Sequence, residues 1–544
     1  MTDNKPSRRL TPSYRPEQTR STPPCQHACP NCGDIRGWIG IVAQAEKNGI
    51  PKKQAFERAW RTIADVNPFP ASLGRICPHP CESDCNRGDK DEPLAINAME
   101  RFLGDYAIEQ GLKFDSPVKE DHCKSIGVVG AGPSGLSFAY QVRRRGHDVT
   151  VYDGRDKPGG MLRYGIPDYR LPPAVLDAEI ERIVALGVRL VMNIRVGLDL
   201  SLNDLYERHD HVYVGIGAQQ GMTMEIEGED GPGVITAVDY LRAMNGGQPP
   251  SVGEDVVVVG GGNSAIDAAR TARRAGARVT LLYRRRIEEM PANPSDIEEA
   301  IEESVNMVFL AAPLRVERSD RGVPAALHAV RIKLEGEDES GRPRPVAVPG
   351  SDFRIPVSGV ITAISQAPDF NGLEHCEDLL DAGGPKGSRE GLLFGGDVLG
   401  LGIAGNAIVQ GRYAAERLHE TFMGIVKSPD ESLPILDGQK VNFATKAFMP
   451  MARPEAVSAD ERLGNPTLEV YGTLNEGQFL NEAGRCFSCG SCHGCERCTM
   501  YCTSNSFTRL DNAGPGRYFS LDLAACQECG KCVEVCPCGF LQLS

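Results

Sequence analysis

Two stretches of the chain share one pattern: a short run of β-branched residues, then closely spaced glycines, then a helix-forming segment. The first begins SIGVVGAGPSG at Ser125, and the second begins EDVVVVGGGNSA at Glu254. A strand, a glycine turn and a helix in this order are typical of a β–α–β unit in a parallel sheet. The pattern therefore predicts two α/β folds in the middle of the chain, each built on its own parallel sheet.

The glycine turn of the first unit predicts a dinucleotide site. The GAGPSG turn allows a tight bend and the close approach of a pyrophosphate to the N-terminus of the following helix. Asp153 ends the next strand, about 20 residues further on, where an acidic side chain binds a ribose hydroxyl in such folds. The contacts predicted for this site are Gly130, Gly132, Pro133, Ser134, Gly135 and Asp153.

The second unit predicts a site for a nicotinamide nucleotide. Its second strand ends in LLYRRR, with arginines where NAD-type sites place an acid. Arg284, Arg285 and Arg286 could bind a 2′-phosphate, which favours NADPH. A solvated basic turn is the alternative, so NADH stays open. The contacts predicted for this site are Gly260, Gly262, Asn263, Ser264, Ala265, Arg284 and Arg285.

Two dinucleotide folds in one chain predict a flavoprotein with separate FAD and NAD(P) sites. The later stretch GLLFGGDVLGLGIAGNAIVQGR, from Gly391, resembles the glutathione-reductase-like superfamily, in which the FAD fold is interrupted by the NAD(P) fold. The middle of the chain has only Cys123 and Cys376, so it lacks the cysteine pair of a disulfide reductase. The resemblance implies that Asp397 meets the ribityl chain and that a helix begins near the isoalloxazine. The contacts it adds are Gly217, Asp397, Gly405, Asn406 and Ala407.

Seventeen of the nineteen cysteines lie toward the two ends of the chain, six from Cys25 to Cys85 and eleven from Cys486 to Cys538. Two runs of C-x2-C-x2-C-x3-C near the C-terminus match the two-cluster ferredoxin pattern, in which the fourth cysteine of each run ligates the other cluster. Cys486 and Cys489 are then spare structural thiols, or they replace Cys495 or Cys498 in a shifted run. The predicted [4Fe–4S] ligands are Cys492, Cys495, Cys498 and Cys536 for one cluster, and Cys526, Cys529, Cys532 and Cys502 for the other.

The N-terminal cysteines carry a second resemblance. The motifs CQHACP and GRICPHPCESDC, with GGMLRYGIPDYRLP after the first glycine turn, resemble the small subunit of bacterial glutamate synthase and the large subunit of NADH-dependent ferredoxin:NADP oxidoreductase. That family holds two N-terminal clusters, but here an upstream C-x2-C is absent and Leu73 occupies a usual cysteine position. One N-terminal cluster is therefore predicted. The resemblance implies Cys29, Cys77, Cys81 and Glu100 as its ligands, with Cys25 or Cys85 as alternatives to Glu100, and Gly160 and Met161 as further flavin contacts.

The C-terminal module, fused behind this part, resembles DsrL-type iron–sulfur flavoproteins, which serve dissimilatory sulfite reductase in sulfur metabolism. The resemblance implies an NAD(P)H oxidoreductase with FAD and three [4Fe–4S] clusters whose partner is dissimilatory sulfite reductase. A soluble ferredoxin or a glutamate synthase large subunit remains open as the partner. A redox sensor or relay subunit without turnover is the alternative from another class. Hydride transfer requires no acid–base residue, so no catalytic side chain is predicted.

Composition excludes other classes. The net charge of −14, without a basic stripe, argues against nucleic-acid binding. No apolar run approaches the ~20 residues of a membrane helix, and the N-terminus has no apolar signal region, so a cytoplasmic protein is expected. A homodimer is also expected, because the connector is long enough for the ferredoxin-like arm to fold over a neighbouring protomer. The predicted order is a flexible arm (1–20), a helical [4Fe–4S] domain (21–122), an FAD domain in two parts (123–250 and 356–425) around an NAD(P) domain (251–355), a surface connector (426–485) and an α+β ferredoxin-like domain (486–544).

Overall fold

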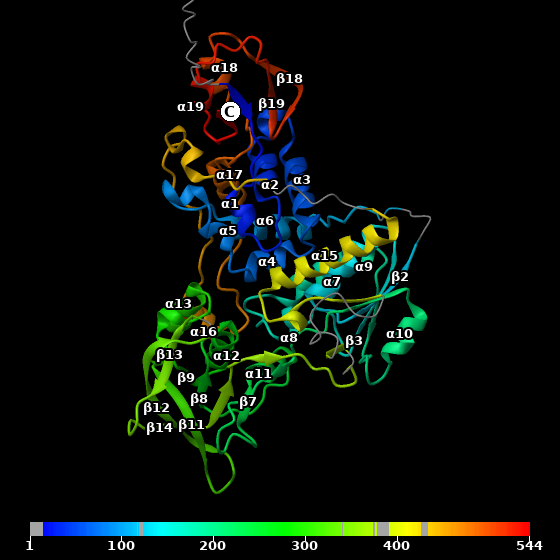
Figure 1. Ribbon diagram of the computed structural model, residues 1–544. Helices are drawn as coiled ribbons and strands as arrows, with labels where there is room; N and C mark the ends of the chain where they lie inside the picture. Colours follow the sequence, from blue (N-terminus) through cyan, green and yellow to red (C-terminus); the bar gives the residue numbers. More distant parts are fainter. Residues whose placement is uncertain are drawn as a thin grey trace, which may run out of the picture.

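The computed structural model describes residues 15–116, 118, 123–339, 341–373, 376–377, 391–425 and 433–543. Figure 1 shows two α/β domains, with the NAD(P) domain in green at the bottom and the FAD domain in cyan and yellow to its right. The N-terminal helices, in blue, lie above them, and the C-terminal module, in red, lies at the far end of these helices. In the described residues, no helix is long and apolar enough for a membrane span.

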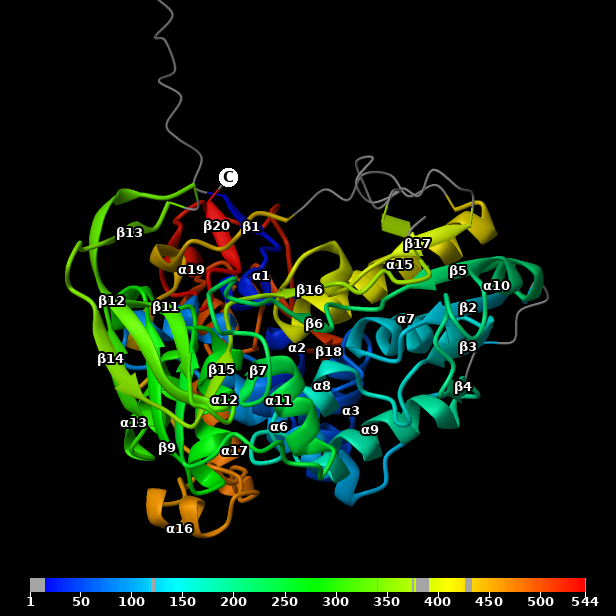
Figure 2. The ribbon, with the colours of Figure 1, turned by 90° about the horizontal axis from the view of Figure 1, so that it is seen from below.

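The FAD domain is a five-stranded parallel sheet in the order β17-β5-β2-β3-β4. The first glycine turn lies between β2 and α7, as predicted, and the interrupted fold resumes with β17 and α15. Helices α7 and α15 lie side by side against the sheet (Figure 2). The elements are β2 (Ser125–Val129), α7 (Pro133–Arg144), β3 (Asp148–Asp153), α8 (Met161–Tyr164), α9 (Pro173–Ala185), β4 (Arg189–Met192), α10 (Leu202–Arg208), β5 (His211–Val214), β17 (Leu392–Phe394) and α15 (Ala404–Met423).

The NAD(P) domain has a second parallel sheet, in the order β10-β9-β8-β15-β7, flanked by an antiparallel sheet of β11 to β14. The chain crosses between the two domains on β6 and β16, which pair antiparallel. The elements are β6 (Gln220–Gly221), β7 (Val234–Thr236), α11 (Ala237–Asn245), β8 (Asp255–Val259), α12 (Asn263–Arg274), β9 (Arg278–Tyr283), α13 (Pro294–Glu302), β10 (Asn306–Phe309), β11 (Ala311–Arg318), β12 (Pro324–Glu337), β13 (Pro343–Ala347), β14 (Phe353–Pro356), β15 (Gly359–Thr362) and β16 (Gln366–Ala367).

The structure moves the predicted boundaries of this domain outward. Strands β7 and β15, which the predicted limits of 251 and 355 left in the FAD domain, both belong to the second sheet. Their parallel pairing with each other and with β8 places them there, because neighbouring strands in a sheet share their backbone hydrogen bonds. The crossing at Gln220–Gly221 and Gln366–Ala367 is the physical boundary.

The N-terminal domain is helical, as predicted. Asp34 caps α2 by accepting a hydrogen bond from the Gly37 backbone N–H at 3.0 Å. Helices α4 and α6 pack very closely, since a Cβ built on Gly104 would lie 2.3 Å from the backbone nitrogen of Ala71. The elements are β1 (Pro16–Gln18), α1 (Pro24–Ala28), α2 (Ile35–Ala43), α3 (Lys52–Ala64), α4 (Pro70–Ile76), α5 (Pro80–Ser83) and α6 (Ile96–Glu109).

The predicted connector is in part a structural element of the N-terminal domain. It contains α16 (Ala459–Gly464) and α17 (Glu476–Arg485), and the apolar face of α17 is buried in the core of the N-terminal helices. Phe479 is fully buried, and its ring stacks on Phe102 with 4.4 Å between centroids. A Pro-rich segment with weak periodicity hides such a helix, because only ten residues carry its pattern.

The C-terminal module docks on the same helices. Its elements are α18 (Arg497–Tyr501), β18 (Phe507–Gly514), β19 (Arg517–Leu521), α19 (Lys531–Glu534) and β20 (Leu541–Leu543). The Tyr518 hydroxyl donates to Gln44 Oε1 at 2.7 Å. Strand β20 pairs antiparallel with β1, so residues 16–18 of the predicted flexible arm form a strand, while residues 1–14 lie outside the described residues. The two ends of the chain therefore meet.

Candidate cofactor sites

A cavity of about 240 Å³ lies at the carboxyl ends of the FAD-domain strands. In open parallel sheets, ligands bind at this edge. Ten of the predicted contacts line the cavity, and Tyr152, Arg155 and Arg195, which no motif indicated, line it as well. The predicted residues that line it are Gly130, Gly132, Pro133, Ser134, Asp153, Gly160, Met161, Gly217, Asp397 and Ala407.

The glycines shape this cavity by steric necessity. Gly130 has a φ of 103°, and a Cβ there would lie 2.4 Å from the carbonyl oxygen of Gly215. A Cβ on Gly160 would lie 2.7 Å from Gly132 Cα. Only glycine fits both positions, and the resulting bare backbone at the start of α7 is a cradle that matches a pyrophosphate. The residues present therefore fit FAD.

Two acidic side chains face this cavity. Asp153 accepts from the backbone N–H groups of Ala131 at 2.7 Å and of Arg155 at 2.8 Å, which fixes its carboxylate beside the glycine turn. Burial raises the pKa of Asp397. Asp397 follows Gly396 and precedes α15, whose N-terminus favours negative charge nearby.

Three of the contacts predicted for the flavin line neither cofactor cavity. Gly135 serves packing, because a Cβ there would lie 2.0 Å from the Gly130 carbonyl oxygen. Gly405 faces Pro30 of the N-terminal domain, and the Asn406 side chain lies against Gly402. These three residues shape the backbone next to the cavity, but their atoms do not line it.

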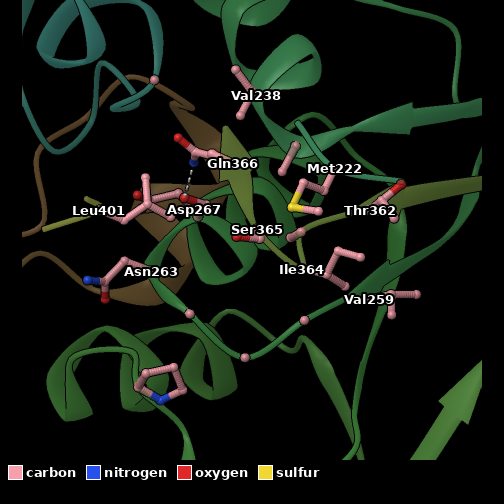
Figure 3. Close-up of a pocket in the computed structure, with 18 of the residues that line it drawn as sticks. Met222, Val238, Val259, Asn263, Asp267, Thr362, Ile364, Ser365, Gln366 and Leu401 are labelled. Carbon is pink, nitrogen blue, oxygen red and sulfur yellow. Dashed lines mark hydrogen bonds between the residues drawn. The ribbon is translucent and has the colours of Figure 1, made fainter. Parts of the chain in front are cut away.

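A second, larger cavity of about 940 Å³ lies between the two α/β domains. Gly260, Gly262, Asn263 and Ser264 line it at the start of α12, whereas Ala265 is buried in the domain core and does not. Figure 3 shows Asn263, Asp267 and Gln366 around this cavity, where the Gln366 amide donates to Ser264 Oγ at 3.2 Å. The glycine turn and the helix N-terminus repeat the dinucleotide geometry of the first site.

The two predicted arginines of this cavity differ. Arg284 is exposed at the cavity wall. Arg285 is buried, and its guanidinium donates to Asp338 at 2.5 Å and to the Pro343 carbonyl at 2.8 Å. The guanidinium of Arg285 is therefore already bound by groups of the protein. Of the two arginines, only Arg284 has a charge that is available to a ligand in the cavity.

The larger cavity also reaches the flavin site and the N-terminal domain. Pro133, Met161, Asp397 and Ala407 line both cavities. Ile76 and Pro78, on either side of Cys77, line the larger one. The nucleotide turn, the flavin cradle and a cysteine of the helical domain thus meet around one space.

Cys29, Cys77, Cys81 and Glu100 lie together beside this space and form what we call the proximal set. Burial, with the nearby charges of Glu100 and Cys29, raises the pKa of Cys77 to about 12. Burial is the main cause that raises the pKa values of Cys29 and Cys81, and the nearby charge of Glu100 adds to both. Burial raises the pKa of Glu100 to about 7, while the Asn67 amide donates to its Oε1 at 2.8 Å. Thiols and a carboxylate bind iron in their deprotonated form, so these four groups are suitable ligands for a cluster.

The C-terminal cysteines form two further sets. Cys492, Cys495, Cys498 and Cys536 surround one small cavity and are the inner set. Cys502, Cys526, Cys529 and Cys532 surround another and are the outer set. Each set combines three cysteines of one run with the fourth of the other, which is the exchange predicted from spacing.

Family comparisons match most of the described molecule. The pyridine nucleotide-disulphide oxidoreductase family matches residues 124–384, and the dihydropyrimidine dehydrogenase domain II, 4Fe-4S cluster family matches residues 16–112. The glutamate synthase [NADPH] small chain of Escherichia coli (strain K12) is 32% identical over 421 residues, which are 72% of this chain and 87% of that protein. The chain belongs to the glutamate synthase small-chain family.

The NADP(+)-dependent formate dehydrogenase subunit beta of Moorella thermoacetica is also similar, at 37% identity over 445 residues. These residues are 75% of this chain but only 61% of that subunit. Among solved structures, Mycobacterium tuberculosis FprA in complex with NADPH has a TM-score of 0.49 at 18% identity, over 57% of this chain and 88% of that one.

As a member of the glutamate synthase small-chain family, the chain combines a pyridine nucleotide-disulphide oxidoreductase domain with a 4Fe-4S cluster domain. The matches to the two family models end at residue 384. The inner and outer sets lie beyond them and add cysteine groups that indicate further clusters.

Proposed function

We propose that the protein passes electrons between NAD(P)H and a protein partner through FAD and [4Fe–4S] clusters. The observation that carries this proposal is the shared space of about 940 Å³, lined by the nucleotide turn, by residues of the flavin cradle and by the neighbours of Cys77. FAD, when bound, accepts a two-electron hydride and releases electrons singly, which suits one-electron clusters.

The side chains of this chain then have binding and positioning roles. The turn at Gly260 and Gly262 binds the nucleotide phosphates at the N-terminus of α12, and exposed Arg284 meets a 2′-phosphate of NADPH. Asp397 and the N-terminus of α15 orient the flavin against the nicotinamide. The proximal set holds the nearest cluster, because its three thiols and one carboxylate supply four ligands next to Ile76 and Pro78.

The inner and outer sets continue the path toward the C-terminal surface. Met500 and Tyr501 stand directly before Cys502 of the outer set, and 77% and 51% of their surfaces are exposed. Large exposed apolar side chains beside a redox centre suit contact with a partner protein. The outer set is therefore our candidate for the electron exit.

An anaerobic reduction experiment tests the chain of electron transfer. The cluster-loaded protein is mixed with NADPH or with NADH, and flavin bleaching and the electron paramagnetic resonance signals of reduced clusters are followed. We expect the flavin to be reduced first and the cluster signals to follow. Flavin reduction that never produces a cluster signal would contradict the proposal.

For the partner we propose dissimilatory sulfite reductase, on the resemblance of the C-terminal module to DsrL-type proteins. The test is NAD(P)H oxidation that requires sulfite, this protein and the reductase together, with a control that lacks the reductase. Dye-linked oxidation without a response to sulfite would reject this partner. A glutamate synthase large subunit or a ferredoxin would then take its place, as the family membership favours.

A further inference from the structure

Two cysteines that the spacing analysis left as spare thiols lie against the N-terminal domain. Cys486 follows the last residue of α17, and Cys489 lies three residues later. They meet Cys25, on α1, and Cys85, just after α5. We call these four cysteines the bridging set, because more than 400 residues separate its two halves.

All six pairs within the bridging set are close enough for their charges to interact. Burial raises the pKa of Cys25 well above its usual range, and Cys85, Cys486 and Cys489 each raise it further. Burial raises the pKa of Cys85 to about 11, with Cys486 adding to it. Burial raises the pKa of Cys489 to about 12, with Cys486 and Cys85 adding to it.

Hydrogen bonds hold the Cys486–Cys489 turn in place. Arg36 of α2 donates to the carbonyl oxygens of Cys489 at 2.6 Å and of Ser21 at 2.9 Å. The Asn86 amide, next to Cys85, donates to the Cys489 Sγ at 3.5 Å. These contacts come from the N-terminal domain, so the turn is fixed toward Cys25 and Cys85 by its surroundings as well as by its own chain.

The buried ion pairs beneath this turn strengthen the docking. Arg87 donates to the Arg485 carbonyl at 3.0 Å and pairs with Asp91 at 2.5 Å. Arg485 pairs with Glu482 at 2.5 Å and with the same Asp91 at 3.2 Å. Each charge is buried and paired, so the segment is locked to the loop after Cys85.

The backbone of the Cys486–Cys489 turn repeats that of the ferredoxin-like runs. Ser488 has a φ of 58°, and its N–H donates to the Cys486 Sγ at 3.3 Å. In the outer set, Glu528 has a φ of 56°, and its N–H donates to the Cys526 Sγ at 3.4 Å. A left-handed residue before the second cysteine and an N–H aimed at the first sulfur are what a thiolate ligand pair needs in both places.

A single zinc ion is a poor fit. Across the part of the chain that the structure describes, no three Cys, His, Asp or Glu residues are grouped as one metal ion requires. A [4Fe–4S] cube is larger, and its four ligands stand farther apart than the ~2.3 Å bonds of one zinc ion allow. Four mutually close thiols supply the four ligands that a [4Fe–4S] cluster needs.

We propose that Cys25, Cys85, Cys486 and Cys489 hold a fourth [4Fe–4S] cluster, which joins the N-terminal domain to the C-terminal module. In the assembly step each of the four thiols displaces one thiolate ligand of a preformed cluster, and the departing thiolate takes up the thiol proton as the new sulfur–iron bond forms. The upstream C-x2-C that the N-terminal sequence lacks is thereby replaced by one from the other end of the chain.

The covalent order of the ligands places this cluster between the others. Cys25 and Cys29 are joined by the five-residue helix α1, so the bridging and proximal sets are adjacent. Cys489 and Cys492 are three residues apart, so the bridging and inner sets are within about 11 Å of chain. The bridging set thus supplies the one-electron step between the flavin side and the ferredoxin-like module. This role rests on the proposed function, whereas the site itself does not.

The test compares iron content among variants of the full chain, loaded anaerobically. The variants are the double substitution C486S/C489S, the single substitution C25S, and C123S as a control at an exposed cysteine outside all four sets. We expect about 16 irons per chain in the unsubstituted protein and in C123S, and about 12 in both other variants, because each [4Fe–4S] cluster carries four. FAD content serves as the check on folding.

Spectroscopy decides whether the two distant substitutions remove the same site. We expect C25S and C486S/C489S to lose the same component of the Mössbauer and paramagnetic resonance spectra. About 12 irons in every protein, or about one zinc per chain, would overturn the fourth cluster. Either result leaves the proposed function standing, because that function is tested separately by reduction of the remaining clusters with NAD(P)H.

Discussion

In the two α/β domains each cofactor cavity is lined mainly by residues that directly follow the strands of one sheet. In the iron–sulfur half, by contrast, the bridging set joins segments from opposite ends of the chain. The FAD cradle takes Gly130 and Asp153 from neighbouring strands. The bridging set takes Cys25 and Cys486 from the two ends.

This difference has a physical origin. A parallel sheet brings the carboxyl ends of its strands to one edge, so a local motif already determines where its residues lie. The bridging set has no such local rule, because its four thiols come from two distant segments that only packing brings together. A substitution in a glycine turn should therefore weaken only the cofactor site that contains it. A substitution in the core between the two ends of the chain should destabilise the whole iron–sulfur half.

The largest effect is expected for Gly130→Ala. The added methyl group would lie 2.4 Å from the Gly215 carbonyl oxygen, at a backbone φ of 103° that favours glycine. We expect purified protein with at least about tenfold less bound FAD, because the pyrophosphate cradle must open. Flavin absorbance after gel filtration measures this loss.

Gly276→Ala is the matched control. Gly276 has a φ of 96°, but a Cβ there meets nothing within 4 Å. Gly276→Ala therefore introduces the same backbone strain without a steric clash of the new methyl group, so the FAD content should stay normal. Equal FAD loss in both variants would show that strain alone, and not the shape of the cradle, is responsible.

The second prediction concerns the packing that joins the two ends of the chain. Phe479→Ala removes a fully buried ring from between Phe56 and Phe102. We expect the free energy of unfolding of the iron–sulfur half to fall by about 3–5 kcal/mol. Calorimetry should show a lower first transition, while the transition of the nucleotide half moves little.

Phe448→Ala, at a ring that is 72% exposed in the same segment, is the control and should change neither transition. If Phe479→Ala lowers both transitions equally, the two halves unfold as one cooperative unit. The difference between the two halves would then apply to how their cofactor ligands are brought together, but not to how the halves unfold.

Most of the fold could be predicted from the sequence, because the features that determine it are short local motifs. The two glycine turns, the cap at Asp34 and the exchange between Cys502 and Cys536 follow from short spacings that the structure reproduces. The domain boundaries and α17 could not be predicted, because strand partners and helix burial depend on distant contacts. The docking of Cys486 beside Cys25 is of this second kind, since no spacing relates residues so far apart.

The third prediction tests the contact between the two halves through pH. Glu179 of α9 accepts from the N–H groups of Ala71 and Ser72 of α4, at 2.7 and 3.0 Å. Burial raises its pKa to about 7. The folded protein then binds more protons than the unfolded chain between about pH 4.5 and pH 7, so its stability falls as the pH rises through this range.

Glu179→Gln should remove this slope, which is worth up to about 3 kcal/mol. Urea unfolding at several pH values measures it. Glu181→Gln, at an exposed carboxylate on the same helix, should leave the slope unchanged. An identical slope in Glu179→Gln would show that another group couples the two halves to pH.

The smallest effect on binding is expected at the nucleotide site, where the arginines of the basic turn after β9 have different roles. Arg284 is exposed at the cavity wall, while the neighbouring Arg285 is bound to Asp338. Arg284→Ala should raise the KM for NADPH about tenfold, near 1.4 kcal/mol, and barely change the KM for NADH, because only NADPH carries the 2′-phosphate. Arg286→Ala, an exposed arginine that does not line the cavity, should change neither constant. Equal effects of Arg284→Ala on both nucleotides would assign Arg284 to a phosphate that they share, and the preference for NADPH would then lose its structural basis.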